Sequence, residues 1–541
     1  MNSIIRIIVF LSLFITMGLA AAQTSIQRGN GAEPETLDIH KSSGVPEANI
    51  QRDLFEGLIA EAADGGPIPG VAESWSVSDD GLIYRFQLRD DARWSNGEPV
   101  TAGDFAFAFE RALNPKTASD YAFILWPIKN AERYSKGEID DPAQLGIEAL
   151  DDSTLKITLA SPTPYFLSLL THHMAYPVSR KAIMSYGRQW TRPGKLVSNG
   201  AYQLAEWQPQ SHILLVKNPH FHDAKHVTVD TIRYLPTEDK NAELRRFRAG
   251  ELDITEDVPS SQIPWIRKNL ADSFHSTPYI GTYYLAFNLT TEPFASQPML
   301  RRALALAIDR KLLTSKVTKG GEIPALGWVP PGVDHYEPQA MNAARLDQKA
   351  REAQARMLYQ KAGYDRGQPL TVELLYNTSD NHKKIAIAVA AMWKKVLGVK
   401  TRLRNEEWKV YLDSRKKRDF QIIRAGWIGD YNDAYTFLSL FKSDVGQMNP
   451  SGYANAAYDT LIKKAESTTD PERRATLMQQ AEAKLLEDLP FIPLYYYTTQ
   501  HLVSPSIEGW QDNVMDGCTS QPFSAQEALS LLAIALTLGV H

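Results

Sequence analysis

Alternating apolar and polar residues predict several short strands in the first half of the chain. Residues 81–89, "GLIYRFQLR", alternate like a half-buried strand, and Asn96-Gly97 predicts a turn after it. Three further strands are predicted by apolar runs at 153–159, 212–218 and 231–236.

Apolar residues at helical spacing predict helices in two places. Residues 101–115, "TAGDFAFAFERALNP", form one of them: we expect Thr101 to cap it with Asp104 in a capping box, and Pro115 lies past its end. Residues 297–317 predict one long amphipathic helix.

In the region from 370 to 431, segments with the apolar spacing of strands alternate with segments that have the spacing of helices. It predicts strand, helix, strand, helix and strand at 370–377, 382–398, 399–404, 406–418 and 419–427. This order implies parallel strands with crossover helices, and ligands bind beyond the carboxyl ends of such strands. Polar segments follow the first and third strands at 377–382 and 426–431, so we expect a ligand wall at that edge.

Asp430 is the anionic candidate at this edge. It lies near Trp427, Tyr431 and Tyr435, and a partly desolvated carboxylate is costly unless a cation or hydrogen-bond donors meet it. Arg424 could be that partner in a structural ion pair. Alternatively, Asp430 awaits a cation of the ligand and Arg424 an anion, which would suit a zwitterion.

Composition and charge indicate an exported globular protein of two or three domains. The 541 residues are too many for one core, and the net charge of -5 argues against nucleic-acid binding. Residues 1–22 have one early positive charge, an apolar run and three alanines, which predicts an export signal cleaved before Gln23. A transmembrane anchor is the alternative, although the run is short for a bilayer.

Catalytic and metal chemistry have little support in the sequence. Cys518 is the single cysteine, so no internal disulfide can form. His220, His222 and His226 lie close together and leave a metal site possible, but no second cluster supports one. No hydrolase, zinc-protease or nucleotide-binding motif is present, so we expect neither an enzyme nor a cofactor.

Several longer segments carry a family resemblance. They include "AESWSVSDDGLIYRFQLRDDARWSNGEPVTAGDFAFAFERALNP", "DLFEGL", "SNGAYQLAEW", "RRALALAIDR", "LLYNTSDNHKK", "NEEWKVYLDSRKKRDFQIIRAGWIGDYND" and "PFIPLYYY". With them the chain resembles the large solute-binding proteins of bacterial peptide ABC importers (family 5), which include oligopeptide binders and murein-tripeptide binders.

The resemblance implies an α/β periplasmic-binding-protein fold of the type II, three-domain class. Two lobes would close on a cleft, and an extra α/β lobe would be added. The implied parts are a signal peptide at 1–22, domain I at 23–56, 180–280 and 498–541, domain II at 57–179, and domain III at 281–497.

The resemblance also implies roles for individual residues. Asp430 would hold the α-ammonium group of a peptide, and Arg424 and His382 would receive its carboxylate. Side-chain pockets would be lined by Asn377, Trp408, Trp427, Tyr121 and Tyr284. Residues 44–46, with Val45, and 424–427, with Gly426, would flank the extended peptide as strands and bind its main chain.

The chain departs from these relatives at several positions. Ala434 stands where proline is common in the relatives. Ser43 stands where relatives can have an acid, and this difference would change the selectivity for basic peptides. Gly281 and Ile428 replace a possible cysteine pair. After residue 516 the sequence looks foreign to the family, and we expect a frame-shifted or replaced terminus.

The leading hypothesis is a monomeric periplasmic protein of a Gram-negative host. It would capture short oligopeptides and deliver them to an inner-membrane ABC permease with its ATPases. The alternatives are a binder of murein tripeptide, an opine or a metal chelate on the same fold, and an exported hydrolase that uses histidines.

Overall fold

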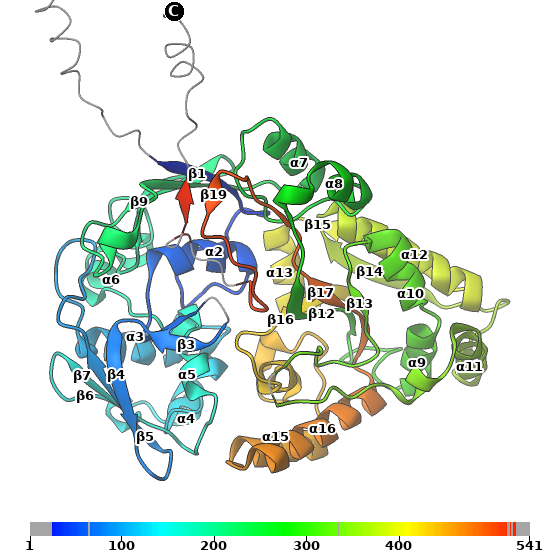
Figure 1. Cartoon of the computed structure of the whole chain (residues 1–541). Coiled ribbons are helices and arrows are strands. Elements are labelled where there is room, and N and C mark those ends of the chain that lie inside the picture. The colour runs from blue at the N-terminus through cyan, green and yellow to red at the C-terminus, as the bar shows by residue number, and fades with distance from the viewer. Residues whose placement is uncertain (1–23, 63–64, 334, 517–519, 521–522, 526–541) are drawn as a thin grey trace, which may run out of the picture.

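The structure is a computed structural model that describes residues 24–62, 65–333, 335–516, 520 and 523–525 (Figure 1). The predicted export signal and Cys518 lie outside the described residues. Three larger sheets organise the chain. In Figure 1 the blue and cyan N-terminal part lies opposite the green and yellow part, and the red C-terminal segment runs between them.

The first sheet joins the N-terminal strand to strands far along the chain. β1 (Ser25–Gly29) pairs in parallel with β10 (Thr231–Leu235), and β9 (His212–Lys217) and β8 (Tyr202–Gln208) follow in antiparallel pairing. Helix α2 (Val45–Leu54) packs against β8, and Ile50 and Leu54 enter the core of this sheet. The strands predicted at 212–218 and 231–236 are confirmed.

The expectation of a strand at residues 44–46 is wrong. Gly44 is extended, with φ -123° and ψ 159°, but Val45 begins α2 and Pro46 lies in its first turn. Proline suits this position because its fixed φ is helical and the first-turn N–H groups have no intrahelical acceptor. Val45 therefore presents the start of a helix instead of an extended edge.

The second sheet is antiparallel and is covered by a capped helix. Its order is β4 (Ala72–Val77), β5 (Ile83–Leu88), β7 (Thr154–Thr158) and β6 (Ile147–Ala149). Helix α3 (Ala102–Leu113) packs on it. Thr101 Oγ1 accepts the Asp104 N–H at 3.3 Å and Asp104 Oδ2 accepts the Thr101 N–H at 2.9 Å, which confirms the predicted capping box.

The third sheet contains the predicted β-α-β-α-β unit. Its order is β13 (Ile323–Pro324), β17 (Phe491–Thr498), β12 (Pro278–Phe287), β16 (Ile422–Ile428), β14 (Thr371–Asn377) and β15 (Lys400–Glu406). β15, β14 and β16 are parallel, and the crossovers are α12 (Asp380–Leu397) and α13 (Trp408–Lys417). Gly398 ends α12 with φ +85°, the left-handed conformation that glycine adopts without strain. The prediction for this region is confirmed.

The single long helix predicted at 297–317 is wrong. Helix α9 (Pro298–Leu306) ends before Asp309, whose carboxylate accepts the Leu312 N–H at 2.9 Å and starts α10 (Arg310–Leu312). The buried Arg310 guanidinium donates to the carbonyls of Ala305 and Ile308 at 3.0 and 3.2 Å. A cap and a buried cation satisfy the groups freed by the break, so regular apolar spacing does not keep the helix continuous.

Shorter elements complete the fold. The other helices are α4 (Ala131–Ser135), α5 (Phe166–Leu169), α6 (Arg180–Tyr186), α7 (Lys240–Arg248), α8 (Ile263–Asn269), α11 (Gln348–Lys361), α14 (Tyr435–Leu438), α15 (Ala456–Glu466) and α16 (Pro471–Asp488). Strand pairs are formed by β2 (Ile59–Glu61) with β3 (Pro67–Pro69), β11 (Phe274–His275) with β18 (His501–Leu502), and β19 (Ile507–Glu508) with β20 (Ser524–Ala525).

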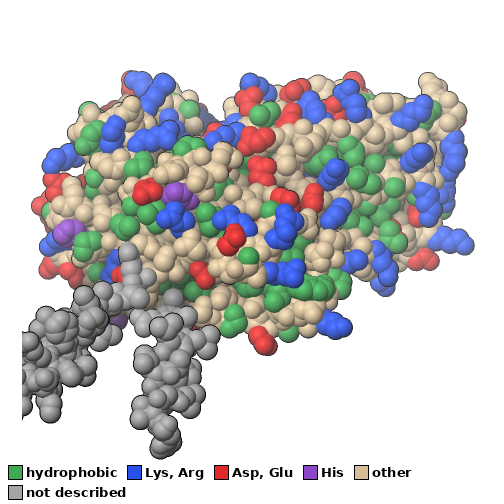
Figure 2. All heavy atoms as spheres, turned by 90° about the horizontal axis from the view of Figure 1, so that it is seen from above, with side chains coloured by type: hydrophobic (Ala, Val, Ile, Leu, Met, Phe, Trp, Pro, Cys, Tyr) green, Lys and Arg blue, Asp and Glu red, His purple; other side chains and the backbone are tan. Residues whose placement is uncertain are grey.

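The three sheets come from different parts of the chain: the first from residues 25–29 and 202–235, the second from 72–158 and the third from 278–498. The division into domains stays a prediction. Among the described helices, none combines the length and apolar character needed to cross a bilayer. Acidic and basic side chains are interspersed over the face in Figure 2.

Part of the unusual C-terminal segment packs onto the first sheet. The Ser520 N–H donates to Asp53 Oδ1 at 2.8 Å, and the buried Phe523 ring stacks on Trp510. The origin of this terminus stays a hypothesis, because most of its residues lie outside the described part.

Candidate ligand-binding site

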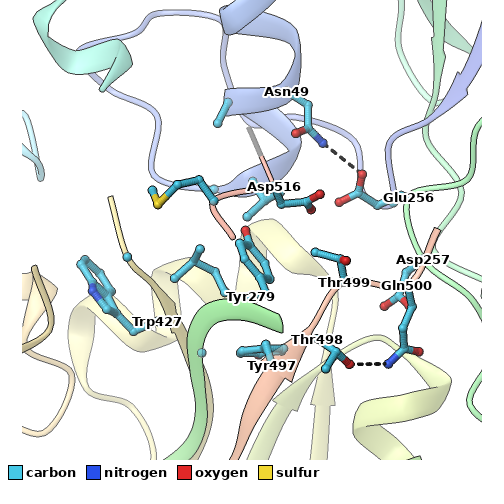
Figure 3. A pocket seen from close by; sticks show the side chains of 18 of the residues that line it. Asn49, Glu256, Asp257, Tyr279, Trp427, Tyr497, Thr498, Thr499, Gln500 and Asp516 are labelled. Carbon is cyan, nitrogen blue, oxygen red and sulfur yellow. Dashed lines mark hydrogen bonds between the residues drawn. The ribbon is translucent and has the colours of Figure 1, made fainter. Parts of the chain in front are cut away.

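A cavity of about 400 Å³ is lined by residues from the three regions of the chain that contain the three larger sheets. Its walls come from α2, the segments around Thr171 and Lys240, strand β16, and the C-terminal segment at 498–501 and 515–516. Figure 3 shows Asn49, Trp427, Asp516 and residues 497–500 around the cavity. Most of the residues predicted for the site line it: Val45, Tyr121, His382, Trp408, Arg424, Gly426, Trp427 and Asp430.

Asp430 is nearly enclosed, with 10% of its side chain exposed. Thr436 Oγ1 donates to Asp430 Oδ2 at 3.1 Å. Burial raises the pKa of the Asp430 carboxyl to about 7, although Thr436 and Arg52 oppose this shift. In the described part of the chain, no Lys or Arg forms an ion pair with it within 4.0 Å, so its charge is poorly compensated.

His172 contacts Asp430 without neutralising it. Its Nε2 lies 3.5 Å from Asp430 Oδ1, which would be an ion pair only if the imidazole were protonated. Burial and the neighbouring His173 and Arg52 hold the pKa of His172 well below its usual value. The ring is therefore neutral near pH 7, and this contact is at most a hydrogen bond.

Arg424 supplies a buried cation in the same cavity. Its Nη1 donates to Asn377 Oδ1 at 3.2 Å and its Nη2 to the Tyr497 hydroxyl at 3.0 Å. The guanidinium lies 4.6 Å from the centroid of the Tyr283 ring, and its Nε has no hydrogen-bond partner in the described part of the chain. Within the described residues, neither Asp430 nor another carboxylate lies within 4.0 Å of it, so the structural Arg424–Asp430 pair is not formed.

Stacked aromatic rings line part of the same cavity. The Trp427 and Tyr121 rings are 6.3 Å apart at an interplanar angle of 9°, and Tyr121 stacks on His172 at 5.3 Å. Trp408 stacks on Tyr411 at 5.5 Å. The buried Nε1 donors of Trp408 and Trp427 have no partner among the described residues, so the cavity offers hydrogen-bond donors as well as flat apolar surface.

His382 lies near the Arg424 end of the cavity. The Tyr283 hydroxyl lies 3.3 Å from His382 Nδ1, and burial together with Arg424 and Lys240 keeps the pKa of this imidazole well below its usual value. A neutral His382 can offer a ligand carboxylate a hydrogen bond but no charge.

Two residues predicted for the site do not line the cavity. Tyr284 is 2% exposed and packs against Trp328 and Phe491 in the core of the third sheet. Asn377 ends β14 and positions the Arg424 guanidinium. Their assignment to side-chain pockets stays a prediction.

Strand β16 presents a free backbone edge to the cavity. β14 pairs with it only as far as Ile423, whereas β12 pairs with it through Ile428. The Gly429 N–H bonds to the Ile280 carbonyl, so by alternation the backbone groups of Gly426 point away from β12. A Cβ on Gly426 would lie 2.4 Å from the Tyr497 hydroxyl, so a larger residue at this edge would require Tyr497 to shift.

The structure adds charged residues that sequence reasoning missed. Arg52, Arg415, Glu256 and Asp516 all line the cavity. Arg52 lies on α2, immediately before the segment "DLFEGL", and Arg415 lies two helical turns after Trp408 on the same face of α13. From these spacings the sequence could have predicted that the two arginines line the site.

The positions that depart from the relatives lie at or near the site. Gly281 and Ile428 are cross-strand partners in β12 and β16, and Ser43 lines the cavity. Asp433, which precedes Ala434, is paired with Arg474 at 2.6 Å. The histidines at 220–226 do not converge: His222 contacts Glu56 and His226 contacts Asp223, and the described chain holds no group of three or more potential metal ligands.

Comparison with known proteins assigns the family. Residues 66–449 match the family described as bacterial extracellular solute-binding proteins, family 5 Middle. The chain is 40% identical over 495 residues to the periplasmic oligopeptide-binding protein OppA of Escherichia coli (strain K12), covering 91% of this chain and 90% of that protein. It therefore belongs to the family 5 bacterial extracellular solute-binding proteins, which confirms the expected fold class.

Solved structures agree and distinguish two conformations. The Escherichia coli murein tripeptide binding protein MppA matches at TM-score 0.91 and 40% identity, covering 93% of this chain and 99% of that one. Haemophilus influenzae OppA in complex with RPPGFSPFR matches at TM-score 0.90 and 36% identity, covering 93% of this chain and 99% of that one. The unliganded open form of MppA matches at a TM-score of only 0.67 and 40% identity, covering 93% of this chain and 98% of that one. The present structure thus resembles the peptide complex more than the open form.

Proposed function

We propose that this protein is exported to the periplasm, binds short peptides in the cavity, and delivers them to an ABC permease with its ATPases. The observation that carries the proposal is the pair Asp430 and Arg424. Among the described residues, each is a buried ionisable group with no Asp, Glu, Lys or Arg of opposite charge within 4.0 Å, and both line one cavity. A peptide carries an ammonium and a carboxylate group, so one ligand could compensate both.

The free edge of β16 supports binding through the main chain. The Arg424 carbonyl already accepts from the Tyr411 hydroxyl at 2.5 Å, so a peptide laid beside Gly426 and Ile428 would add a strand to the third sheet. Main-chain hydrogen bonds are the same for every sequence, which suits a carrier of varied peptides. On the other face α2 contributes its first turn, so Gly44 and Val45 would meet the peptide as a helix start.

Binding to the ligand without chemical change fits the residues of the cavity. Its unpaired groups are carboxylates, guanidinium groups and aromatic donors, all suited to recognition of a zwitterion. The similar proteins named above are binding proteins. We propose that the protein acts as a monomer and that it hydrolyses none of its ligands.

The first prediction tests the polarity of the peptide. Titration calorimetry with tri- to pentapeptides should give one-to-one binding that weakens by about 2–5 kcal/mol in Asp430→Asn, because the ligand ammonium then lacks its carboxylate. N-acetylation of the peptide should weaken binding to the native protein but add little in the variant. The exposed Asp413→Asn on α13 is the control and should bind normally.

Equal losses on acetylation in both proteins would show that the ammonium lies elsewhere. Native mass spectrometry of the purified protein would identify a co-purifying peptide. Release of amino acids from a peptide by catalytic amounts of protein would favour the hydrolase alternative.

A murein peptide is the second candidate ligand. Arg415 lines the cavity with no carboxylate within 4.0 Å in the described chain, and its one side-chain hydrogen bond goes to Met448 Sδ at 3.7 Å. A ligand with a carboxylate besides its C-terminus could meet this guanidinium. Murein tripeptide binding more tightly than trialanine in the same titrations would favour this candidate.

A further inference from the structure

A long stretch of the chain carries positive charge only. Residues 153–205 contain six Lys and Arg residues and no Asp or Glu, although the whole chain has a net charge of -5. Five of the six cations lie between residues 180 and 195, in α6, in the short 3₁₀-helix Gly187–Gln189 and in the turn after it. In Figure 1 α6 lies at the outer edge of the molecule, on the side away from the third sheet.

The five cations share one surface because this segment folds back on itself. The Arg192 N–H donates to the Gln189 carbonyl at 3.1 Å, and the Lys195 side chain donates to Gln189 Oε1. Lys195 Nζ also lies 5.7 Å from the centroid of the Tyr186 ring. We call this surface the basic face and define it by Arg180, Lys181, Arg188, Arg192 and Lys195.

The acids near the basic face leave most of its charge uncompensated. Of its five cations, only Lys181 forms an ion pair within the described chain, with the partly exposed Glu98. Glu33 is 4% exposed and accepts the Trp207 indole N–H at 2.8 Å. Asp38, which accepts from the Trp190 indole N–H, is buried and paired with Arg111. Both buried acids are therefore satisfied inside the protein.

Two of the guanidinium groups rest on aromatic rings instead of on carboxylates. Arg180 lies 5.3 Å from the centroid of the Phe107 ring, and Arg192 lies 5.0 Å from that of Trp207. Such contacts hold the side chains in place and leave the positive charge intact. The basic face is thus ordered and still charged.

Apolar side chains protrude from the middle of the basic face. Met184 is 74% exposed, the largest fraction among the large apolar residues of the described chain, and Tyr186 is 44% exposed. Ala182 is buried and Ile183 packs on the core of the first sheet, so α6 already has a packed side. Met184 lies on the other side, three residues from Lys181 and therefore next to it on the helix.

We propose that the basic face docks on an anionic phospholipid surface, with Met184 inserted among the headgroups. Lys and Arg are attracted to the lipid phosphates, and an apolar side chain between them is buried at the boundary of headgroups and acyl chains. A protein partner is selected by a charge pattern that fixes its register, whereas the basic face offers one sign only. The inference goes beyond peptide binding and rests on the proposed export, which brings the protein to a membrane surface.

Vesicle co-sedimentation of the exported, ligand-free protein tests the proposal. Vesicles with about one-third phosphatidylglycerol in phosphatidylcholine should bind about tenfold more tightly than phosphatidylcholine alone. This preference should disappear in about 1 M salt, which screens the attraction. Arg188→Gln with Arg192→Gln should lower binding to the anionic vesicles about tenfold or more, because each cation near the surface contributes about fivefold.

The matched control is Arg345→Gln with Lys361→Gln. Both residues are exposed and lie at or near α11, on the opposite side of the molecule in Figure 1, so the same charge is removed outside the basic face. The control should bind like the native protein. The apolar segment at 529–540 is present in every variant, so any binding that it causes cancels in the comparison.

A second pair of variants tests the insertion of Met184. Met184→Ser should lower binding to the anionic vesicles about threefold or more, because less apolar surface is then buried. Met357→Ser is its control, since Met357 is 46% exposed on α11 and outside the basic face. Neither side chain is buried, so neither substitution disturbs a packed core.

Three results would overturn the proposal. The first is equal binding to both kinds of vesicle, and the second is an equal loss in the basic-face and control variants. The third is no vesicle binding but slower peptide uptake through the permease in Arg188→Gln with Arg192→Gln, which would assign the basic face to an acidic protein surface. Titration calorimetry with tripeptides is independent of vesicles, so a failure of the proposed peptide binding is recognised separately.

Discussion

At the scale of the residue, Asp430 lies in a buried environment that destabilises its charged form. The protein gives it one hydroxyl donor and a neutral imidazole, and encloses it among aromatic rings. A lysine beside it would make the empty protein more stable but would compete with a ligand ammonium. The unpaired carboxylate is therefore a site at which stability of the empty protein and ligand affinity oppose each other.

The second prediction follows from the sign of this pKa shift. The pKa of Asp430 is about 7 in the folded chain and about 3.9 in an unfolded one, so the folded state holds the proton more tightly. Its favourable contribution is fully present below pH 4 and is lost as the pH rises to 7. Relative to Asp430→Asn, the empty native protein should lose about 1–4 kcal/mol of unfolding free energy between pH 4 and pH 8.

Urea unfolding of ligand-free protein across this pH range measures the difference. Comparison with the variant removes contributions from other buried acids, such as Glu61 and Glu243, which both proteins share. A difference that does not change with pH would mean that Asp430 titrates normally and is already compensated.

At the scale of the element, β16 connects the fold to the site. Its first residues are held between β12 and β14, which fixes the strand rigidly. Beyond Ile423 the strand still pairs with β12 but no longer pairs with β14. One of its edges is therefore available while the other stays paired. Arg424, Trp427 and Asp430 lie on or just after this half-free strand, so their positions relative to a peptide main chain are set by the sheet.

The third prediction uses the pairing of β12 with β16. Gly281 and Ile428 are opposite each other, and the adjacent pair, Ile280 with Gly429, carries the hydrogen bond at 2.7 Å. They are thus a non-hydrogen-bonded pair, a spacing compatible with a disulfide. Gly281→Cys with Ile428→Cys should oxidise spontaneously and gain about 2–4 kcal/mol of unfolding free energy over its own reduced form.

Denaturant unfolding with and without reductant measures the gain, and mass spectrometry counts free thiols. The single Gly281→Cys variant is the control, since it should show no dependence on reductant beyond that of the native protein. Failure of the double variant to oxidise would contradict the pairing of Gly281 with Ile428.

At the scale of the whole molecule, the structure resembles the closed state. It matches a peptide complex at TM-score 0.90 and an unliganded open form at 0.67. Polar contacts join the parts on the two sides of the cavity at several places, including Ser260 with Asn381 and Lys136 with Asp444. Lys416 Nζ on α13 lies 2.8 Å from Asp120 Oδ2, beside Tyr121, and Asn241 Nδ2 donates to Asp380 Oδ2 at 2.9 Å. These two contacts are partly or fully exposed, so each contributes little to the closed state, which suits a carrier that must release its ligand.

The fourth prediction concerns the Asp120–Lys416 pair. Asp120→Asn should raise the peptide dissociation rate about two- to fivefold, because a partly exposed ion pair contributes about 0.2–1 kcal/mol to the closed state only. Stopped-flow displacement measures the rate, and the effect should fade in high salt. Lys417→Met removes the exposed neighbouring pair with Asp413 and should leave the rate unchanged. Equal effects of both variants would indicate a general charge effect.

The sequence alone determined the local structure and the chemistry of single residues in this protein. Periodicity, the Thr101 capping box and Gly398 specified strands and helices, because these depend on neighbours along the chain. Parallel order placed the ends of β14 and β16 together, which identified Arg424 and Asp430 as one site.

Only the tertiary structure decided what depends on distant partners. The helix break at Asp309 needs the carbonyl of Pro493, which accepts from Arg310 at 2.7 Å, and Tyr284 lies in the core because Trp328 and Phe491 pack on it. Glu61, Glu256 and Asp516 line one cavity although they lie up to 455 residues apart in the sequence. No local pattern marks such a wall, since side chains acquire a common environment only when the backbone between them has folded.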